Sequence, residues 1–325
     1  MRLKRSNLDR PGYRRRGAGR GFTYLRPDGR KLTDPAERER IKALVIPPAW
    51  TDVWICTDPN GHIQATGKDA AGRTQYLYHP DWRVRRDRAK FAHAREVARR
   101  LPRIRDRLQH DLTHGRGLNR ARVLATIVHL LDTGMFRIGS AQYADRDDDP
   151  SFGLSTLRPD HLTARGRCVD LRFPGKSGVE HTGCIEDGDV SMVLRDLKNR
   201  RRHEERLFAY WDPSARRWHE VDAADINDYL REISGRQMTA KDFRTWHGTV
   251  KAAEALAEAG PEKTKTGRRR AEAKAMREVA DLLGNTPSVA RSAYVDPQVV
   301  KAYERGRTID ADAPDPEAQV LDLLD

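Results

Sequence analysis

Short runs of alternating apolar and polar residues occupy the first quarter of the chain. Two pairs of such runs flank a Gly-containing turn, Pro27-Asp28-Gly29 in the first pair and Pro59-Asn60-Gly61 in the second. This arrangement is typical of β-hairpins. A third turn-bounded run follows, so we expect a small, mainly β domain over residues 21–82. The predicted strands cover residues 22–25, 30–32, 53–57, 62–66 and 74–78.

After Pro80 the apolar residues recur with the spacing of amphipathic helices, clearest over residues 119–136. Two strand-like runs, 168–173 and 179–185, flank a Pro-Gly-Lys-Ser-Gly turn, and a second small hairpin is predicted near 207–221. The predicted helices cover residues 84–108, 119–136, 190–202, 223–233, 240–259 and 268–283. We therefore expect an α+β protein whose larger domain, residues 83–308, is mainly helical with a small inserted antiparallel sheet.

The two ends of the chain differ from the rest in composition. Residues 1–20 are basic and rich in Gly, which predicts a flexible arm. Residues 309–325 contain no Lys or Arg and are rich in Asp, which predicts a mobile acidic tail.

Charge narrows the class of partner. The chain has 61 Lys and Arg against 48 Asp and Glu, a net charge of +13, and 38% hydrophobic residues leave enough material for folded cores. Such a balance favours a polyanion, most often nucleic acid. An anionic membrane surface is less favoured, because no segment resembles a membrane span or a basic amphipathic membrane helix. We expect a cytoplasmic, nucleoid-associated protein.

The sequence gives no sign of a metal or cofactor. Cys56, Cys168 and Cys184 form no Cys-x-x-Cys pair, which predicts packing residues in a reducing compartment. The acidic run 145–149 lacks the Gly and Glu that a calcium loop requires, since Pro150 and Thr156 stand at those positions. The His residues lack ligand spacing, and there is no Walker A motif.

Several short motifs, each weak alone, follow one another in a characteristic order. They are Arg-x-Gly at 137–139, Gly-Leu-x-Thr-Leu at 153–157, Gly-Lys at 175–176, Lys-Asp-x-Arg-Thr at 241–245 and Leu-Gly-Asn-Thr at 283–286, followed by Tyr294. In this order the chain resembles the type IB DNA topoisomerases, specifically the small poxvirus-like class also found in bacteria. The resemblance extends over about residues 21–305.

The resemblance implies five catalytic residues: Arg137, Lys176, Arg244, Asn285 and Tyr294. Tyr294 would attack a DNA phosphodiester and become joined to the 3′-phosphate, without ATP or metal. Two guanidiniums suit the charge that develops on the phosphate oxygens, and the Asn285 amide can add a further donor. Lys176, on its turn, would protonate the leaving 5′-oxygen. The acceptor of the tyrosine proton stays open between water and an arginine.

The resemblance also implies DNA contacts by Gln75, Tyr76, Tyr78 and Tyr143. Strand alternation places Tyr76 and Tyr78 on one face and Gln75 on the other. The expected partner is duplex DNA, held by a monomer whose two domains close as a clamp.

Two other interpretations remain. Tyrosine recombinases share this chemistry but typically carry His-x-x-Arg, and here Lys241 stands at the place of that His. Many members of the type IB topoisomerase class carry His at the position of Asn285. Because Asn keeps the donor but cannot carry a charge, a pH dependence from that site should be absent. A non-enzymatic basic DNA-binding protein is the second alternative, and it predicts binding without a covalent adduct.

Overall fold

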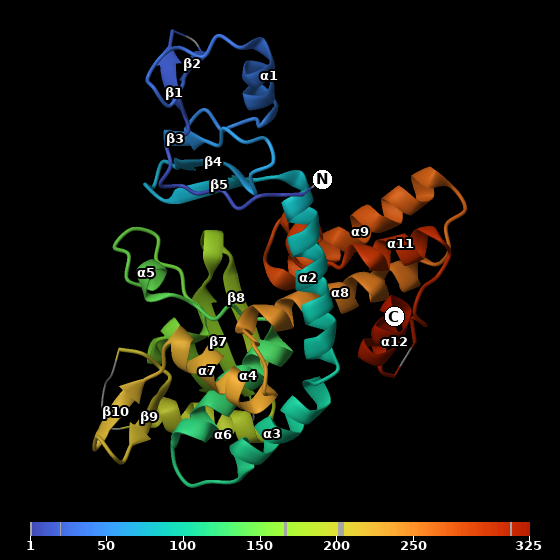
Figure 1. The fold of residues 1–325 in the computed structure, drawn as a ribbon. Coiled ribbons are helices and arrows are strands. Elements are labelled where there is room, and N and C mark those ends of the chain that lie inside the picture. Colours follow the sequence, from blue (N-terminus) through green and yellow to red (C-terminus); the bar gives the residue numbers. More distant parts are fainter. Residues whose placement is uncertain (1, 20, 166–167, 201–204, 313) are drawn as a thin grey trace. The chain divides into compact units, whose positions relative to one another are not determined.

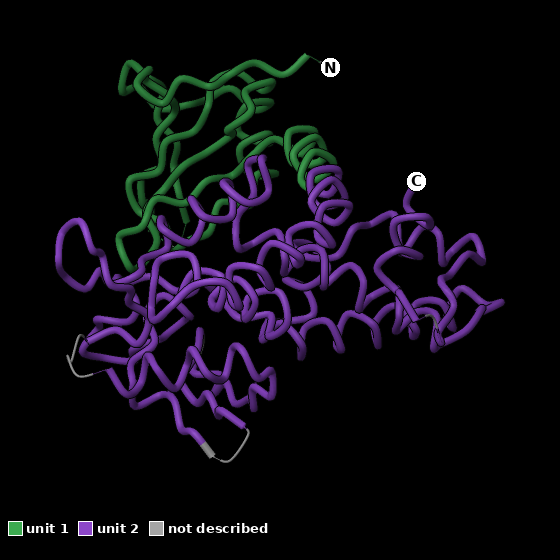
Figure 2. Tube along the Cα trace, turned by 90° about the horizontal axis from the view of Figure 1, so that it is seen from below, with its two compact units in different colours: residues 1–90 green, residues 91–325 purple. Residues whose placement is uncertain are grey.

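The computed structural model describes the chain except for residues 1, 20, 166–167, 201–204 and 313. The chain forms two compact units, residues 1–90 and 91–325, which Figure 2 shows in green and purple. Both contain helices and antiparallel strands, so the protein is a mixed α and β structure. Among the described residues, no helix combines the length and apolar character needed to cross a membrane.

The first unit is built on a five-stranded antiparallel sheet in the order β2-β1-β3-β4-β5 (Figure 1). Its elements are β1 (Tyr13–Ala18), β2 (Gly21–Leu25), α1 (Pro35–Ala43), β3 (Thr51–Ile55), β4 (Ile63–Lys68) and β5 (Thr74–Tyr78). Ile41 of α1 packs with Val53, Ile55 and Ala65 in a small core. The predicted hairpin at 53–66 is confirmed by the pairing of β3 with β4.

Strand β1 differs from the flexible arm expected over residues 1–20. It pairs with β2 on one side and with β3 on the other, where Tyr13 lies opposite Ile55. Tyr13 is buried, and this apolar anchor explains why a segment that is otherwise rich in Arg joins the sheet. The predicted pairing of 22–25 with 30–32 is reduced to one isolated bridge, Leu25 to Lys31, and the main partner of β2 is β1.

The second unit is organised around α4, ten of whose residues are buried. Helices α3, α6, α7 and α8 pack against it. The helices named for this unit are α2 (Pro80–Ala98, which begins before residue 91), α3 (Leu101–Thr113), α4 (Arg120–Gly134), α5 (Ala141–Ala144), α6 (Gly188–Asn199), α7 (Ala223–Ser234), α8 (Ala240–Ala259), α9 (Lys265–Leu283), α10 (Pro287–Ala293), α11 (Pro297–Glu304) and α12 (Pro316–Leu324). The central position of α4 follows from its nearly continuous apolar sequence.

A three-stranded sheet, β6 (Leu162–Arg165), β7 (Cys168–Pro174) and β8 (Glu180–Ile185), and a hairpin of β9 (Ala209–Asp212) and β10 (Arg217–Glu220) complete the unit. Strands β7 and β8 and the β9–β10 hairpin confirm the sequence predictions, whereas β6 was not predicted. The prediction for Cys168 and Cys184 was wrong: they form a disulfide between β7 and β8, with Cα atoms 5.6 Å apart.

Three helical predictions need adjustment. The single helix expected at 84–108 is two helices, α2 and α3, because Pro102 stands in the first turn of α3, where it cannot continue a preceding helix. The helix expected at 190–202 ends at Asn199 as α6, and residues 201–202 lie outside the described part. The expected mobile tail instead carries α12, which packs on α8 and α11 and buries Val320 (Figure 1).

Candidate active site

Arg137 lies just beyond the C-terminus of α4. Met135 adopts a left-handed conformation there, with φ of 52°, and turns the chain away from the helix axis. Nη2 of Arg137 donates to the Gly284 carbonyl and to Oδ1 of Asn285, both at 2.8 Å. Nη1 is buried and has no partner among the described residues. Arg137 is therefore held by one edge of its guanidinium, which leaves another N–H group available for a ligand.

Arg244 lies in the first turns of α8 and is only 3% exposed. Its Nη2 donates to the Leu283 carbonyl at 2.6 Å, and its Nη1 donates to the Met135 carbonyl. Its Nε is buried without a partner among the described residues. Burial lowers the pKa of Arg244, and burial together with the charge of Arg244 lowers that of Arg137. Because arginine starts from a very high pKa, both guanidiniums remain charged.

Asn285 follows Gly284, whose left-handed conformation (φ +57°) ends α9. The amide oxygen of Asn285 accepts from Arg137, and its Nδ2 lies 3.3 Å from the Leu283 carbonyl. An Asn amide has two N–H donors, so one remains for a further acceptor. The turn after α9 thus supplies carbonyls to both arginines and an amide beside them.

Tyr294 directly follows α10, a short helix capped by Thr286 with Pro287 in its first position. Its backbone is fixed from α8, because Oγ1 of Thr249 donates to the Tyr294 carbonyl at 3.1 Å. The Arg244 guanidinium lies 5.2 Å from the centre of the Tyr294 ring. Arg137 thus contacts Asn285 and Arg244 contacts Tyr294, and the Leu283 carbonyl, which accepts from Arg244 and Asn285, connects the two pairs.

Lys176 begins the single-turn 3-10 segment between β7 and β8, and it is exposed. The Gly175 N–H donates to the Val179 carbonyl at 2.8 Å and closes the turn. A Cβ placed on Gly284 would lie 3.9 Å from Val179 Cγ1, so the turn packs beside the Gly284–Asn285 segment. Lys176 is thus carried next to the other four residues, although within the described part of the chain its ammonium forms no hydrogen bond or ion pair with them.

The four predicted DNA contacts lie in two different units. Tyr76 and Tyr78 share one face of β5, as predicted, with ring centres 6.0 Å apart, and Tyr76 is 42% exposed. Gln75 donates from Nε2 to Asp69 at 2.9 Å. Tyr143 belongs to α5 in the second unit, where the Arg146 guanidinium lies 4.6 Å from its ring centre.

His181 is one of the histidines without ligand spacing and was not predicted as a site residue, yet it lies beside this site. Burial and the charges of Arg137 and Arg244 lower its pKa. A sequence signal for this placement is the position of His181 two residues after Val179, which packs beside Gly284. Because successive residues of a strand alternate between its faces, both side chains are expected on the same face.

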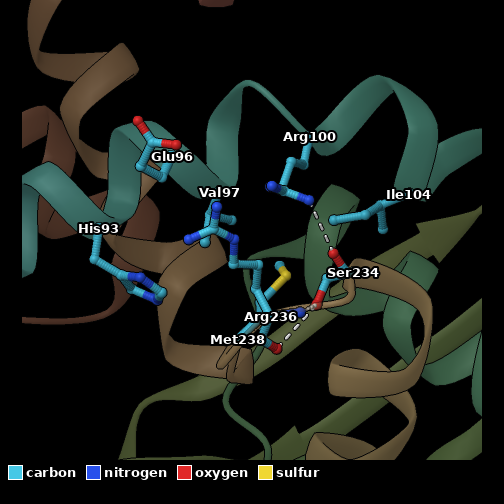
Figure 3. A pocket seen from close by; sticks show the side chains of 8 residues that line it. All are labelled: His93, Glu96, Val97, Arg100, Ile104, Ser234, Arg236 and Met238. Carbon is cyan, nitrogen blue, oxygen red and sulfur yellow. Dashed lines mark hydrogen bonds between the residues drawn. The ribbon is translucent and has the colours of Figure 1, made fainter.

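A separate pocket of about 60 Å³ lies where α2 and α3 meet the segment before α8 (Figure 3). Arg100 donates from its guanidinium to the Ser234 carbonyl at 3.3 Å. The pocket is smaller than typical ligand sites and includes none of the five predicted catalytic residues. We therefore treat it as a packing feature.

Comparison with known proteins shows the family to which the chain belongs. A family model described as the eukaryotic DNA topoisomerase I catalytic core matches residues 79–314, and a model of the bacterial DNA topoisomerase IB N-terminal domain matches residues 21–69. The chain is 29% identical to DNA topoisomerase 1B of Acanthamoeba polyphaga mimivirus over 302 residues, covering 90% of this chain and 88% of the relative. It is 23% identical to DNA topoisomerase 1 of Rabbit fibroma virus (strain Kasza) over 298 residues, covering 85% and 87%.

These matches identify a DNA topoisomerase, an enzyme whose substrate is DNA. The chain belongs to the type IB family, and the match to the bacterial N-terminal domain indicates its bacterial branch.

Proposed function

We propose that this type IB topoisomerase relaxes supercoiled duplex DNA through a transient covalent bond between Tyr294 and a 3′-phosphate, without ATP or a metal ion. The observation that carries the proposal is the pairing of Tyr294 with Arg244, whose guanidinium lies 5.2 Å from the phenol ring. A nucleophile held next to a permanently charged, buried donor suits attack on an anionic phosphodiester.

The cleavage step exchanges one phosphate ester for another. The Tyr294 oxygen forms a bond to phosphorus, the phenol gives its proton to water, and the bond from phosphorus to the 5′-oxygen breaks. The unpartnered Nη1 of Arg137 and Nε of Arg244 are suited to the nonbridging oxygens, where negative charge accumulates. The remaining amide donor of Asn285 adds to this set.

The leaving 5′-oxygen needs a proton, because an alkoxide is a poor leaving group. Lys176 is exposed on the turn beside Gly284, so its ammonium is free to approach a bound strand. We assign it the role of general acid, which typically contributes about 10²–10⁴-fold in rate. Rejoining uses the same groups in reverse, since the phosphotyrosyl ester retains the energy of the original bond.

DNA binding involves both units in this proposal. Gln75, Tyr76 and Tyr78 of β5 would contact duplex DNA from the first unit, and Tyr143 from the second, with the units closing as a clamp. The net charge of +13 supports affinity for the phosphate backbone. We propose that the enzyme acts as a monomer in the nucleoid, because one chain supplies all five catalytic residues.

Relaxation of supercoiled plasmid tests the proposal. The native chain should relax the plasmid in EDTA without ATP, and Tyr294→Phe should not, while both bind DNA equally. Denaturing the reaction should trap the native chain on the 3′ side of a nick, which end-labelled DNA detects. Relaxation by Tyr294→Phe would remove Tyr294 as the nucleophile, and an adduct on the 5′ side would overturn the proposed polarity. DNA binding with neither relaxation nor adduct would favour a binding protein, and recombination of paired sites a recombinase.

A further inference from the structure

His181 lies in the sheet that carries the Lys176 turn, but no step proposed so far uses it. On β8 it is opposite Phe173 of β7. Its imidazole stacks on the Phe173 ring, with centres 5.1 Å apart, and meets Phe136 at 6.0 Å. Two aromatic rings from different segments therefore fix the plane of the half-buried imidazole.

Two glycines border the same imidazole. A Cβ on Gly175 would lie 2.3 Å from Cδ2 and 2.5 Å from Nε2 of His181, distances that no real side chain could adopt. A Cβ on Gly284 would lie 3.8 Å from Cε1 of the ring. The Cδ2–Nε2 edge of the ring therefore fills the space beside Gly175, which precedes Lys176, and the adjacent Cε1 atom faces Gly284, which precedes Asn285.

The surroundings of His181 favour an uncharged ring. Arg137, beyond α4, and Arg244, on α8, face it across the site, and Lys176 lies on its own hairpin. Burial and the two guanidinium charges lower the pKa of His181, so the ring adds no further positive charge at neutral pH. Neither ring nitrogen has a hydrogen-bond partner in the described part of the chain. The contacts of His181 are thus those of a packed spacer.

We propose that His181 is a positioning residue for Lys176. Its ring sets the distance between the Gly175–Lys176 turn and the Gly284–Asn285 turn, where Arg137 is anchored. Lys176 is exposed and begins a short turn, which the hydrogen bond from Gly175 to the Val179 carbonyl closes. Without the ring, the turn can collapse toward Gly284 or move away from it. The inference rests on the proposed function, in which Lys176 acts as general acid.

Single-turnover cleavage of two DNA substrates tests the inference. One has the ordinary 5′-oxygen at the scissile bond, and the other has sulfur there. A thiolate leaves without a proton because a thiol is a much stronger acid than an alcohol, so the sulfur substrate does not need a general acid. Lys176→Ala, His181→Ala and His181→Phe are compared with the native chain, and circular dichroism checks that each variant folds. His181→Phe is the matched control, because it retains a flat ring that can stack on Phe173.

His181→Ala should cleave ordinary DNA about 10–100-fold more slowly, since misplacement of a catalytic group by about 1 Å costs up to about 10²-fold. On the sulfur substrate its rate should lie within about threefold of the native rate. His181→Phe should stay within about threefold of native on both substrates. Lys176→Ala should show the same pattern as His181→Ala, with a larger defect on ordinary DNA.

The possible failures are distinguishable. If Lys176→Ala is slow on both substrates, its proposed role as general acid is wrong. If the sulfur substrate rescues Lys176→Ala but not His181→Ala, the positioning role of His181 is overturned while the general acid stands. A defect in His181→Phe equal to that of His181→Ala would overturn the spacer account.

Discussion

Asp132→Asn should lower the free energy of unfolding by about 2.5 kcal/mol at neutral pH, with a loss that shrinks in acid. Asp132 lies near the end of α4 and is 5% exposed. Its carboxylate accepts from Nε and Nη2 of Arg105, at 2.7 and 3.1 Å, and lies 2.7 Å from Nε2 of His247. Arg105 also binds Glu317 of α12. One buried carboxylate thus joins α4 to α3, α8 and the C-terminal helix.

The magnitude follows from the pKa of Asp132. Burial opposes ionisation, but the hydrogen bonds with His247 and Arg105 outweigh it and lower the pKa from 3.8 to about 2. At 1.36 kcal/mol per pKa unit, this difference corresponds to about 2.5 kcal/mol. Because the pKa is lowered in the folded state, the stabilisation is complete above the unfolded value of 3.8. It is lost as the pH falls below this value and through about 2, where folded Asp132 becomes protonated.

Urea unfolding followed by circular dichroism at pH 7, 5 and 3 measures the effect. The difference between native and Asp132→Asn proteins should be nearly constant from pH 7 to 5 and clearly smaller at pH 3. Asp148→Asn, which changes an exposed carboxylate, should unfold like the native chain at each pH. A difference for Asp132→Asn that does not change between pH 7 and 3 would refute the assignment of the effect to ionisation of this group.

Three further substitutions probe the site and the first unit. Arg244→Lys should slow formation of the covalent adduct by about 10²–10³-fold, because one ammonium cannot serve two carbonyls and the phosphate; a loss below tenfold would contradict this. A Cβ on Gly248 would lie 3.1 Å from both Tyr294 Cβ and Leu283 Cδ1, so Gly248→Ala should slow cleavage by about tenfold by displacing Tyr294. An unchanged single-turnover rate would show that Tyr294 tolerates the shift. Tyr76→Ala should weaken DNA binding by about tenfold in fluorescence anisotropy at fixed salt, and equal affinity would exclude Tyr76 from the interface.

The alternation of apolar and polar residues, together with the turn residues, correctly predicted much of the fold. The β3–β4 hairpin combines alternation with a Pro-Asn-Gly turn, and α9 ends at Gly284, where the sequence places a helix-ending Gly. The prediction of a flexible arm over residues 1–20 was wrong because the basic composition was taken to indicate exposed side chains. Arg15 instead donates to the carbonyls of Ile46, Pro47 and Trp50, at 3.1, 3.0 and 2.6 Å. A basic side chain that satisfies a loop backbone cannot be distinguished by composition from one that is solvated.

The prediction of a mobile tail over residues 309–325 was wrong for a different reason. Its acidic residues have cationic partners far away in the sequence: Arg105 binds Glu317, and Arg99 binds Asp325 at 2.5 Å. Complementarity between segments more than 200 residues apart leaves no local periodicity to detect. The apolar residue Val320, which α12 buries, was too isolated a signal among acidic neighbours.

Motif order predicts which residues form the candidate site, whereas their geometry depends on turns that no motif describes. Arg244 is anchored by the carbonyls of Met135 and Leu283, and Arg137 by that of Gly284. Met135 and Gly284 are themselves the left-handed residues that end α4 and α9. The same two helix ends therefore fix both guanidiniums, while each arginine keeps a buried N–H group without a partner among the described residues. In the proposed mechanism the carbonyls hold both charges in place before DNA arrives, so the phosphate would bind with little reorganisation. Electrostatic stabilisation is strongest under this condition.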